Sequence, residues 1–189
     1  APLDKGKINA KEGGVRVPFI ISGPGIQPGI SPDAIASGLD FYPTILNWTG
    51  TPKPQGQQLD GLDLTPFLKA DKRTRNLIRH SNGKPRDSMV WHFPNSVAMQ
   101  STLRRGNYKL IRNLVEDMIP NRDSLNLYQL YDEAGNRVDI EEANDLSNSK
   151  PALTRELNEL RQSHLDEMQA SPPFLYPSSP AALPKKNKV

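Results

Sequence analysis

The side chains most able to do chemistry gather near the start of the chain, in the stretch GKINAKEGGVRVPFI. Lys7 carries a compact positive charge directly after a flexible glycine, and such a charge suits a tetrahedral anion. Gly13 and Gly14 allow positive φ angles and the close approach of another segment. Glu12 and Arg16 have opposite charges and are placed to brace the turn. On these residues alone, the stretch is either an anion-binding loop or a solvated loop whose charges have no special role.

The rest of the chain offers no self-contained active site. The three histidines, His80, His92 and His164, have no partners at the spacing of metal ligands. There is no cysteine, no Gly-x-Ser-x-Gly motif, no phosphate-binding loop and no dinucleotide fingerprint. Asp60 and Asp63 in LDGLD resemble part of a calcium loop whose remaining ligands are missing. We therefore expect no metal site in this chain.

The composition argues against nucleic-acid and membrane partners. The 24 basic and 21 acidic residues leave a net charge of +3, which is too balanced for a nucleic-acid surface in spite of a pI near 9.1. No apolar run approaches the ~20 residues that span a bilayer. The opening residues APLDKGK lack the apolar centre of a secretion signal, so we expect a start that is processed or cut from something longer.

The first half of the chain is expected to contain one strand and one helix. Residues 15–22 are almost continuously apolar between glycines, which is typical of a strand buried on both faces. A helix is expected between Asp40, its candidate cap, and Gly50, its candidate end. Its apolar residues at helical spacing are Phe41, Ile45 and Trp48. Residues 51–88 are rich in proline, glycine and charge, and are expected to be loops around an ordered segment at 59–68.

The second half is expected to form a small antiparallel sheet with one packed helix. Segments 89–93 and 125–131 contain β-forming residues, and Gly106-Asn107 is a candidate two-residue hairpin turn between two further strands. Residues 151–168 form the expected helix. Its stripe at helical spacing consists of Leu153, Leu157, Leu160, His164 and Met168.

Taken together, these segments resemble the type I, formylglycine-dependent sulfatases. The stretch GKINAKEGGVRVPFIISGPGI is similar to the family pattern Gly-Lys-x-x-x-x-Glu-Gly-Gly-x-Arg-Val-Pro, which a buried strand and a Pro-Gly turn follow. Further similar blocks follow in the family's order: DAIASGLDFYPTILNWTG, LDGLDLTPFL, WHFP, LRRGNYKLI and LYQLYDEAGNRVDIEEANDLS. The resemblance extends from residue 6 to about residue 165.

The resemblance implies an α/β, alkaline-phosphatase-like fold of which this chain holds only the end. Residues 1–50 would be the end of the large domain, with its last strand and helix, and residues 51–88 connecting loops. Residues 89–170 would be the small α+β carboxy-terminal domain, an antiparallel sheet with one packed helix. Residues 171–189 would be a Pro- and Lys-rich tail.

The resemblance also implies hydrolysis of a sulfated small molecule, an aryl or carbohydrate sulfate ester. In the family, a formylglycine made from the Cys or Ser of a Cys/Ser-x-Pro-x-Arg motif is the nucleophile, and a calcium ion binds the sulfate. Both belong to segments upstream of this block, and here no cysteine exists and no serine stands in that context. We therefore expect the carboxy-terminal part of a sulfatase whose partner is the amino-terminal part of the same protein. The family resemblance suggests a periplasmic or secreted location.

Residue by residue, Lys7 matches the sulfate-binding lysine of the family. It would neutralise charge on the sulfate oxygens and on the leaving oxygen, and Lys5 is the alternative two residues away. The motif residues expected to shape the loop that aims Lys7 are Glu12, Gly13, Gly14 and Arg16. Further candidates for substrate contact are His92 in the WHFP turn and Arg104 and Arg105 beside the hairpin turn.

Two other interpretations stay open. The chain is alternatively a non-catalytic module, descended from a sulfatase, that binds a sulfated glycan or a protein through its basic residues. It is alternatively part of a related metal-dependent phosphoesterase or phosphonate hydrolase, because sulfate and phosphate are both tetrahedral oxyanions. In each case the catalytic centre within this chain is incomplete.

Overall fold

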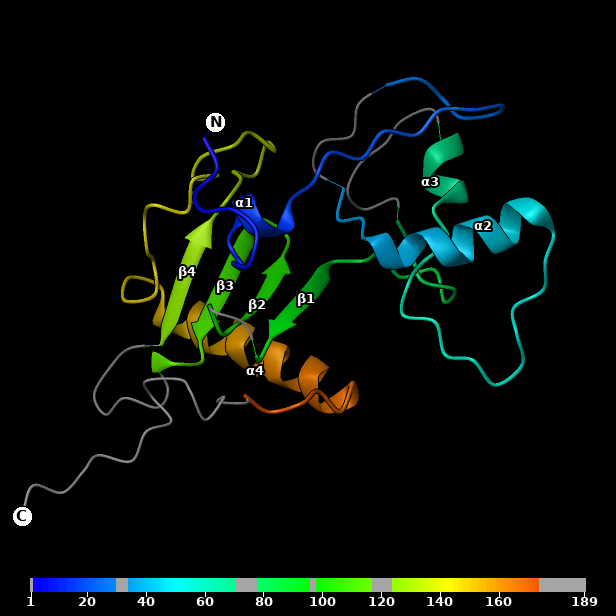
Figure 1. Ribbon diagram of the computed structural model, residues 1–189. Helices are drawn as coiled ribbons and strands as arrows, with labels where there is room; N and C mark the ends of the chain where they lie inside the picture. Colours follow the sequence, from blue (N-terminus) through cyan, green and yellow to red (C-terminus); the bar gives the residue numbers. More distant parts are fainter. Residues whose placement is uncertain (1, 30–33, 71–77, 96–97, 117–123, 174–189) are drawn as a thin grey trace, which may run out of the picture. The chain divides into compact units, whose positions relative to one another are not determined.

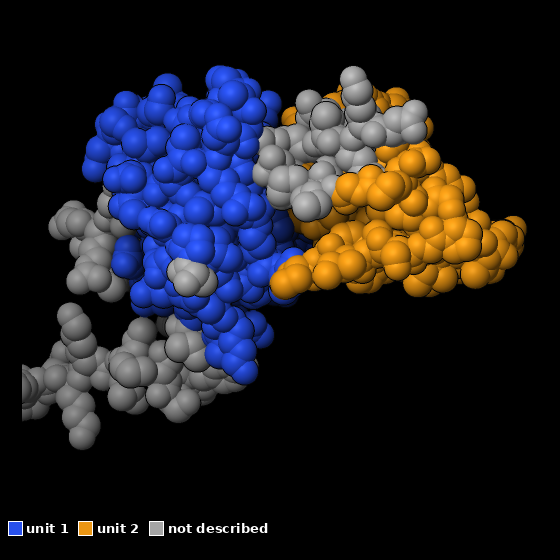
Figure 2. All heavy atoms as spheres, turned by 90° about the horizontal axis from the view of Figure 1, so that it is seen from above, with its two compact units in different colours: residues 1–17, 90–189 blue, residues 18–89 orange. Residues whose placement is uncertain are grey.

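The structure, a computed structural model, describes residues 2–29, 34–70, 78–95, 98–116 and 124–173. The chain divides into two compact units, which Figure 2 shows in different colours. One unit consists of residues 1–17 and 90–189, and the other consists of residues 18–89. Most of the predicted Pro- and Lys-rich tail, from residue 174 onward, lies outside the described residues.

One four-stranded sheet forms the centre of the first unit. Its strands are β1 (Ser88–Phe93), β2 (Gln100–Arg105), β3 (Tyr108–Asn113) and β4 (Leu125–Gln129). They lie in chain order, and the pairs β2/β3 and β3/β4 are antiparallel (Figure 1). Arg105 pairs with Tyr108 across the turn Gly106-Asn107, and Gly106 has a φ of 54°. The predicted two-residue hairpin turn is therefore confirmed.

Helix α4 (Pro151–Glu167) covers one face of this sheet (Figure 1). The core on this face consists of Leu103, Leu110, Leu127 and Leu157, none of which is more than 1% exposed. Leu153 and Leu160 pack against it, so the leucines of the predicted stripe do face the sheet. Met168 lies beyond the end of the helix and is 52% exposed, so the stripe ends before it.

The opposite face of the sheet is covered by the start of the chain and by the segment that follows β4. Side chains alternate along β3, so Leu110 faces α4 whereas Lys109 and Ile111 face the other way. The apolar cluster on this second face consists of Ile111, Tyr128, Leu130, Tyr131 and Ile140, with Leu3 packed against it. The short helix α1 (Glu12–Val15) lies on this side and is bonded to Lys109 and Glu142.

In the described residues of the second unit there are three short helices: η1 (Gly38–Asp40), α2 (Phe41–Thr49) and α3 (Thr65–Lys69). Its core is formed by Leu64, Phe67, Leu68 and Ile78. Gly50 ends α2 in the left-handed conformation, with a φ of 64°, as the sequence predicts. The predicted apolar residues of α2 are turned outward: Phe41, Ile45 and Trp48 are 45%, 53% and 45% exposed. Thr44 is the buried residue of this helix.

The predicted role of Asp40 as the side-chain cap of α2 is wrong. Its carboxylate is fully buried and makes no cap bond to α2. It instead accepts two hydrogen bonds of 2.7 Å from the Arg86 guanidinium and further bonds from the N–H groups of Ser37 and Leu62. A buried carboxylate needs a charged partner and several donors, and this requirement outweighs capping.

The strand predicted over residues 15–22 does not form. Val15 ends α1, and residues 16–23 pair with no strand within the part of the chain that the structure describes. Val17 and Ile20 are 74% and 91% exposed. A strand needs a neighbour to take its backbone hydrogen bonds, and apolar sequence alone does not provide one.

Candidate anion-binding loop

Lys7 lies in a tight loop, residues 4–9, that precedes α1. Its side chain is exposed, and no carboxylate among the described residues pairs with its ammonium group. On either side of it, Lys5 and Ile8 adopt left-handed backbone conformations, with φ of 60° and 74°. Non-glycine residues keep such conformations only where their surroundings hold them. The contacts of the loop therefore decide where the Lys7 side chain points.

The glycine pair of α1 brings the backbone of this loop close. A Cβ on Gly13 would lie 2.6 Å from the Lys5 carbonyl oxygen. A Cβ on Gly14 would lie 2.7 Å from the Gly6 carbonyl oxygen, and closer still to that of Asn9. Neither position has room for a side chain. The close approach of the loop therefore requires glycine at both positions.

Polar contacts fix both ends of the loop. Lys11 Nζ lies 2.7 Å from Asp4 Oδ2, and the Lys11 N–H donates to Asn9 Oδ1 at 2.9 Å. The hydrogen bond from Lys11 holds the pKa of Asp4 below its ordinary value. The Ala10 N–H donates to Gln100 Oε1 on β2 at 2.9 Å. The loop is thereby attached to the sheet as well as to itself.

A buried cluster of charges anchors α1 to the sheet. Lys109 Nζ lies 2.9 Å from Glu12 Oε1 and 3.0 Å from Glu142 Oε1, and the three side chains are at most 3% exposed. The Glu12 N–H donates to Glu142 Oε2 at 2.6 Å. Glu142 therefore holds the backbone of Glu12, and Lys109 holds its side chain.

Two further cations surround Glu12. Arg104 is the cross-strand neighbour of Lys109, so two positive side chains lie next to each other on one face of the sheet. The Arg104 guanidinium also lies over the Tyr131 ring, 5.1 Å from its centroid. Arg16 donates to the Tyr131 hydroxyl at 2.7 Å and lies 3.8 Å from Glu12 Oε2. The predicted pairing of Glu12 with Arg16 exists, but Lys109 is the closer partner of Glu12.

The two buried carboxylates of this cluster are shifted in opposite directions. Burial favours the neutral form of each, but the charges of Lys109, Arg104 and Arg16 outweigh it at Glu12 and lower the pKa of that residue. Burial prevails at Glu142 and raises its pKa. Glu142 also holds a left-handed backbone conformation, with a φ of 55°.

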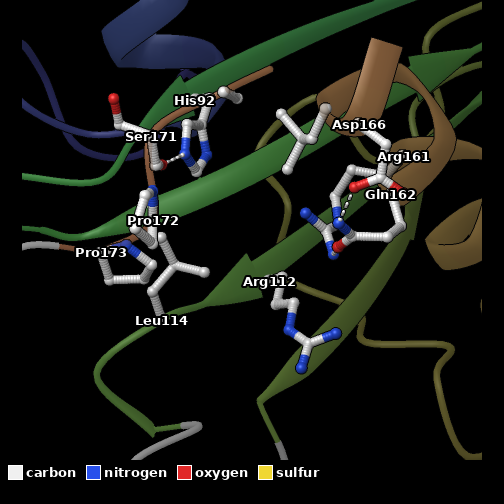
Figure 3. Close-up of a pocket in the computed structure, with 11 residues that line it drawn as sticks. His92, Arg112, Leu114, Arg161, Gln162, Asp166, Ser171, Pro172 and Pro173 are labelled. Carbon is white, nitrogen blue, oxygen red and sulfur yellow. Dashed lines mark hydrogen bonds between the residues drawn. The ribbon is translucent and has the colours of Figure 1, made fainter. Parts of the chain in front are cut away.

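The other candidates for substrate contact lie in different surroundings. Arg104 is 5% exposed and belongs to the buried cluster, whereas Arg105 lies on the surface and pairs with Glu156 at 2.7 Å. His92 lines a cavity of about 300 Å³ beside α4, together with Arg112, Arg161 and residues 170–173 (Figure 3). Its Nε2 lies 2.8 Å from the Ser171 carbonyl oxygen, and Lys7 does not line this cavity. Their contact with a substrate stays a prediction.

Sequence reasoning missed Lys109 and Glu142. In YKLIRN, Lys109 alternates with apolar residues and is typical of the solvent-facing side of a strand. Its burial depends on carboxylates that arrive from elsewhere in the chain, one of them 97 residues away. One signal in the sequence could have pointed to them: the Gly106-Asn107 turn pairs Lys109 with Arg104 across the hairpin, and two adjacent cations require compensating negative charge.

Comparison with known proteins points to one family, although no family model matches the chain. Human steryl-sulfatase is 35% identical over 97 residues, which are 50% of this chain and 17% of the relative. A sulfatase of Formosa agariphila is 30% identical over 139 residues, or 69% of this chain and 21% of the relative. Human arylsulfatase A is 36% identical over 107 residues, or 55% of this chain and 19% of the relative. The matched parts thus span about a fifth of each relative.

A solved structure agrees at the level of the fold. A protein in complex with its substrate, D-glucosamine-2-N,6-O-disulfate, superimposes with a TM-score of 0.50 at 20% identity, over 71% of this chain and 24% of that one. The four-stranded antiparallel sheet with one packed helix agrees with a carboxy-terminal sulfatase domain of the alkaline-phosphatase-like fold. The chain belongs to the sulfatase family, and the part of its relatives that it covers fits their carboxy-terminal portion.

Proposed function

We propose that this chain is the carboxy-terminal portion of an enzyme that hydrolyses sulfate esters of aromatic or carbohydrate alcohols, and that Lys7 binds the sulfate. The names of the relatives, steryl-sulfatase and arylsulfatase A, support the reaction class. The substrate of the structural neighbour, a disulfated glucosamine, supports a carbohydrate as the alcohol. The observation that carries the proposal is the exposed Lys7 ammonium, which lacks a carboxylate partner among the described residues and sits on a tightly held loop.

The chemistry of Lys7 follows from its charge. A sulfate ester carries one negative charge that spreads towards the leaving oxygen as the S–O bond breaks. An ammonium already fixed beside these oxygens stabilises that charge without reorganising, which is worth most in a site from which water is excluded. Lys5 is also exposed and lies two residues away, so a comparison of the two lysines tests the assignment.

In the proposed enzyme, the nucleophile and the metal would come from outside this chain. The chain has no cysteine, and no group of three or more His, Cys, Asp or Glu side chains among the described residues could hold a metal ion. In the proposed enzyme, the formylglycine and the calcium ion belong to the amino-terminal part. Lys7 would approach the same sulfate from this chain.

An apolar surface on the second unit supports a partner of this kind. It consists of Leu39, Phe41, Tyr42, Ile45 and Trp48, which are between 44% and 60% exposed. Large apolar side chains that lie together at a surface mark an interface. We propose that the amino-terminal part of the sulfatase packs on this surface. Residues 16–23, which have no strand partner among the described residues, would then gain a neighbour from that part.

We also propose a location outside the cytoplasm. A relative from Drosophila melanogaster, 42% identical over 71 residues, is named an extracellular sulfatase, and the match covers 38% of this chain and 6% of that relative. Within the described residues, no helix combines the length and the apolar character needed to cross a membrane.

The proposal is tested with the enzyme assembled from this chain and its amino-terminal part. We expect hydrolysis of an aryl sulfate, with a higher kcat/KM than for the matching aryl phosphate. A preference for the phosphate would instead favour the phosphoesterase interpretation. Binding of a sulfated glycan without any hydrolysis would favour the non-catalytic module.

A further inference from the structure

The buried cluster of Glu12, Lys109 and Glu142 has no role in the chemistry described above, yet it lies directly behind the Lys7 loop. Charges this deeply buried are costly, and replacing such groups by apolar side chains of similar volume is often neutral or stabilising in proteins. Such a cluster therefore calls for a role other than stability. What it does visibly is to hold residue 12 in one place.

Two hydrogen bonds hold Glu12 in place. The Glu12 carboxylate accepts from Lys109 Nζ at 2.9 Å, and the Glu12 N–H donates to Glu142 Oε2 at 2.6 Å. Two bonds from one residue to two partners fix both its position and its orientation. Glu142 itself holds a left-handed backbone conformation, with a φ of 55°, which a non-glycine residue keeps only where its surroundings hold it.

Two structural connections link Glu12 and its partners to the loop that carries Lys7. Glu12 is the first residue of α1, and the next two residues are the glycines at which a Cβ would collide with the loop backbone. A second connection runs through Lys11, whose Nζ lies 2.7 Å from Asp4 Oδ2 and donates to the Glu142 carbonyl oxygen at 3.3 Å. Both connections start at the cluster and end in the loop that carries Lys7.

We propose that Glu12, Lys109 and Glu142 are positioning residues for Lys7. By attaching α1 to the carboxy-terminal sheet, this cluster fixes the loop that carries the sulfate-binding ammonium. The inference rests on the proposed function of Lys7. It assigns a positioning role to Lys109, a fully buried residue of β3. The sheet of the small domain is then part of the active-site machinery and more than a support for it.

A double-mutant cycle in the complete enzyme tests this inference. Lys7→Ala and Lys109→Met are each expected to lower kcat/KM for an aryl sulfate by about tenfold or more. If Lys109 acts through Lys7, the double variant should be within about twofold of Lys7→Ala alone. If the two losses multiply to about a hundredfold, Lys109 acts independently of Lys7 and the inference is wrong.

Leu157→Ala is the matched control. Leu157 is 1% exposed and packs on the opposite face of the sheet, so its truncation also loosens this unit. We expect Leu157→Ala to lower the melting temperature while leaving kcat/KM unchanged at a temperature where the enzyme stays folded. An equal loss of kcat/KM in Leu157→Ala would mean that any destabilisation of the unit disturbs Lys7, which would contradict a specific role for the cluster.

A milder variant keeps the test decisive if Lys109→Met fails to fold. Glu142→Gln retains an oxygen that accepts from the Glu12 N–H but weakens the pull on Lys109, and it should lower kcat/KM in the wild-type background and not in Lys7→Ala. An equal loss of kcat/KM in both backgrounds would overturn the inference. If Lys7→Ala by itself leaves kcat/KM unchanged, the proposed function of Lys7 is wrong. If instead the losses of Lys7→Ala and Lys109→Met multiply in the double variant, only the positioning role of the cluster is wrong.

Discussion

Lys109 Nζ lies 2.9 Å from Glu12 Oε1, although 97 residues separate the two in the chain. The side chains are 0% and 3% exposed, so the pair is shielded from solvent. It joins the first residues of the chain to the central strands of the carboxy-terminal sheet. This is why residues 1–17 belong to the same compact unit as residues 90–189.

The pH dependence of stability should report the charge of Glu12. Its pKa is lowered in the folded chain relative to 4.5, so its ionisation stabilises the fold above that pH, and this contribution disappears as the pH falls through the lower folded value. Glu12→Gln should lower the free energy of unfolding by about 1.5–3 kcal/mol near neutral pH. The difference from wild type should shrink below pH 4.5. Urea denaturation at several pH values measures both.

Glu156→Gln serves as the control for that experiment. Its side chain is 60% exposed in a surface pair with Arg105, and such pairs contribute about 0–1 kcal/mol. A difference between Glu12→Gln and wild type that stays constant down to strongly acidic pH would contradict the lowered pKa of Glu12.

Gly14→Ala should displace the Lys7 loop without touching the charge cluster. The new Cβ would lie 2.7 Å from the Gly6 carbonyl oxygen, so the loop backbone must move away from α1. Forcing a methyl group into such a contact costs about 1–3 kcal/mol in stability. We expect a loss of kcat/KM of about tenfold or more in the complete enzyme. In stability measurements on this chain alone, the matched variant Gly23→Ala, where no atom lies within 4 Å of the Cβ position, should be nearly silent.

The buried ion pair of the second unit offers a test of its own. Arg86→Met would leave the fully buried Asp40 carboxylate without its charged partner, and we expect the free energy of unfolding to fall by about 3–5 kcal/mol. The double variant Asp40→Asn with Arg86→Met should recover part of that loss, because the unpaired charge is gone. Denaturation followed by circular dichroism measures this. A double variant as unstable as the sum of the two single variants would argue against the pairing.

The apolar surface of α2 is tested by one substitution in two contexts. Ile45 is 53% exposed in this chain, so Ile45→Ser should hardly change the stability of the chain alone. In the complete enzyme, where we propose that this surface is covered, the same change should lower the melting temperature by several degrees. Val138→Ser is the matched control, since Val138 is also 53% exposed but lies in the other unit. Equal effects of the two substitutions in the complete enzyme would count against the interface.

Local patterns were enough to predict the carboxy-terminal sheet and its helix. The turn at Gly106-Asn107 determines the hairpin, and the leucines at helical spacing in 151–167 identify the face that packs. Both depend on neighbours in the sequence, which is why they could be recognised without the structure. The end of α2 at Gly50 was predictable for the same reason.

The expectations that proved wrong depended on distant partners. Apolar residues at 17–21 predicted a buried strand, but a strand forms only beside another strand, and none among the described residues accompanies them. Lys109 was overlooked because its compensating charges are far from it in the sequence. The loop of Lys7 was recognised through a family pattern, whereas its attachment to the sheet required the structure.

The most direct test of the central claim is the activity of Lys7→Ala beside Lys5→Ala in the complete enzyme, with an aryl sulfate as substrate. Both lysines are exposed and lie in the same loop, so the two substitutions remove equal charge from nearly the same place. We predict a loss of kcat/KM of about tenfold or more for Lys7→Ala and a much smaller change for Lys5→Ala. An unchanged kcat/KM in Lys7→Ala would contradict the claim that this chain contributes the sulfate-binding lysine.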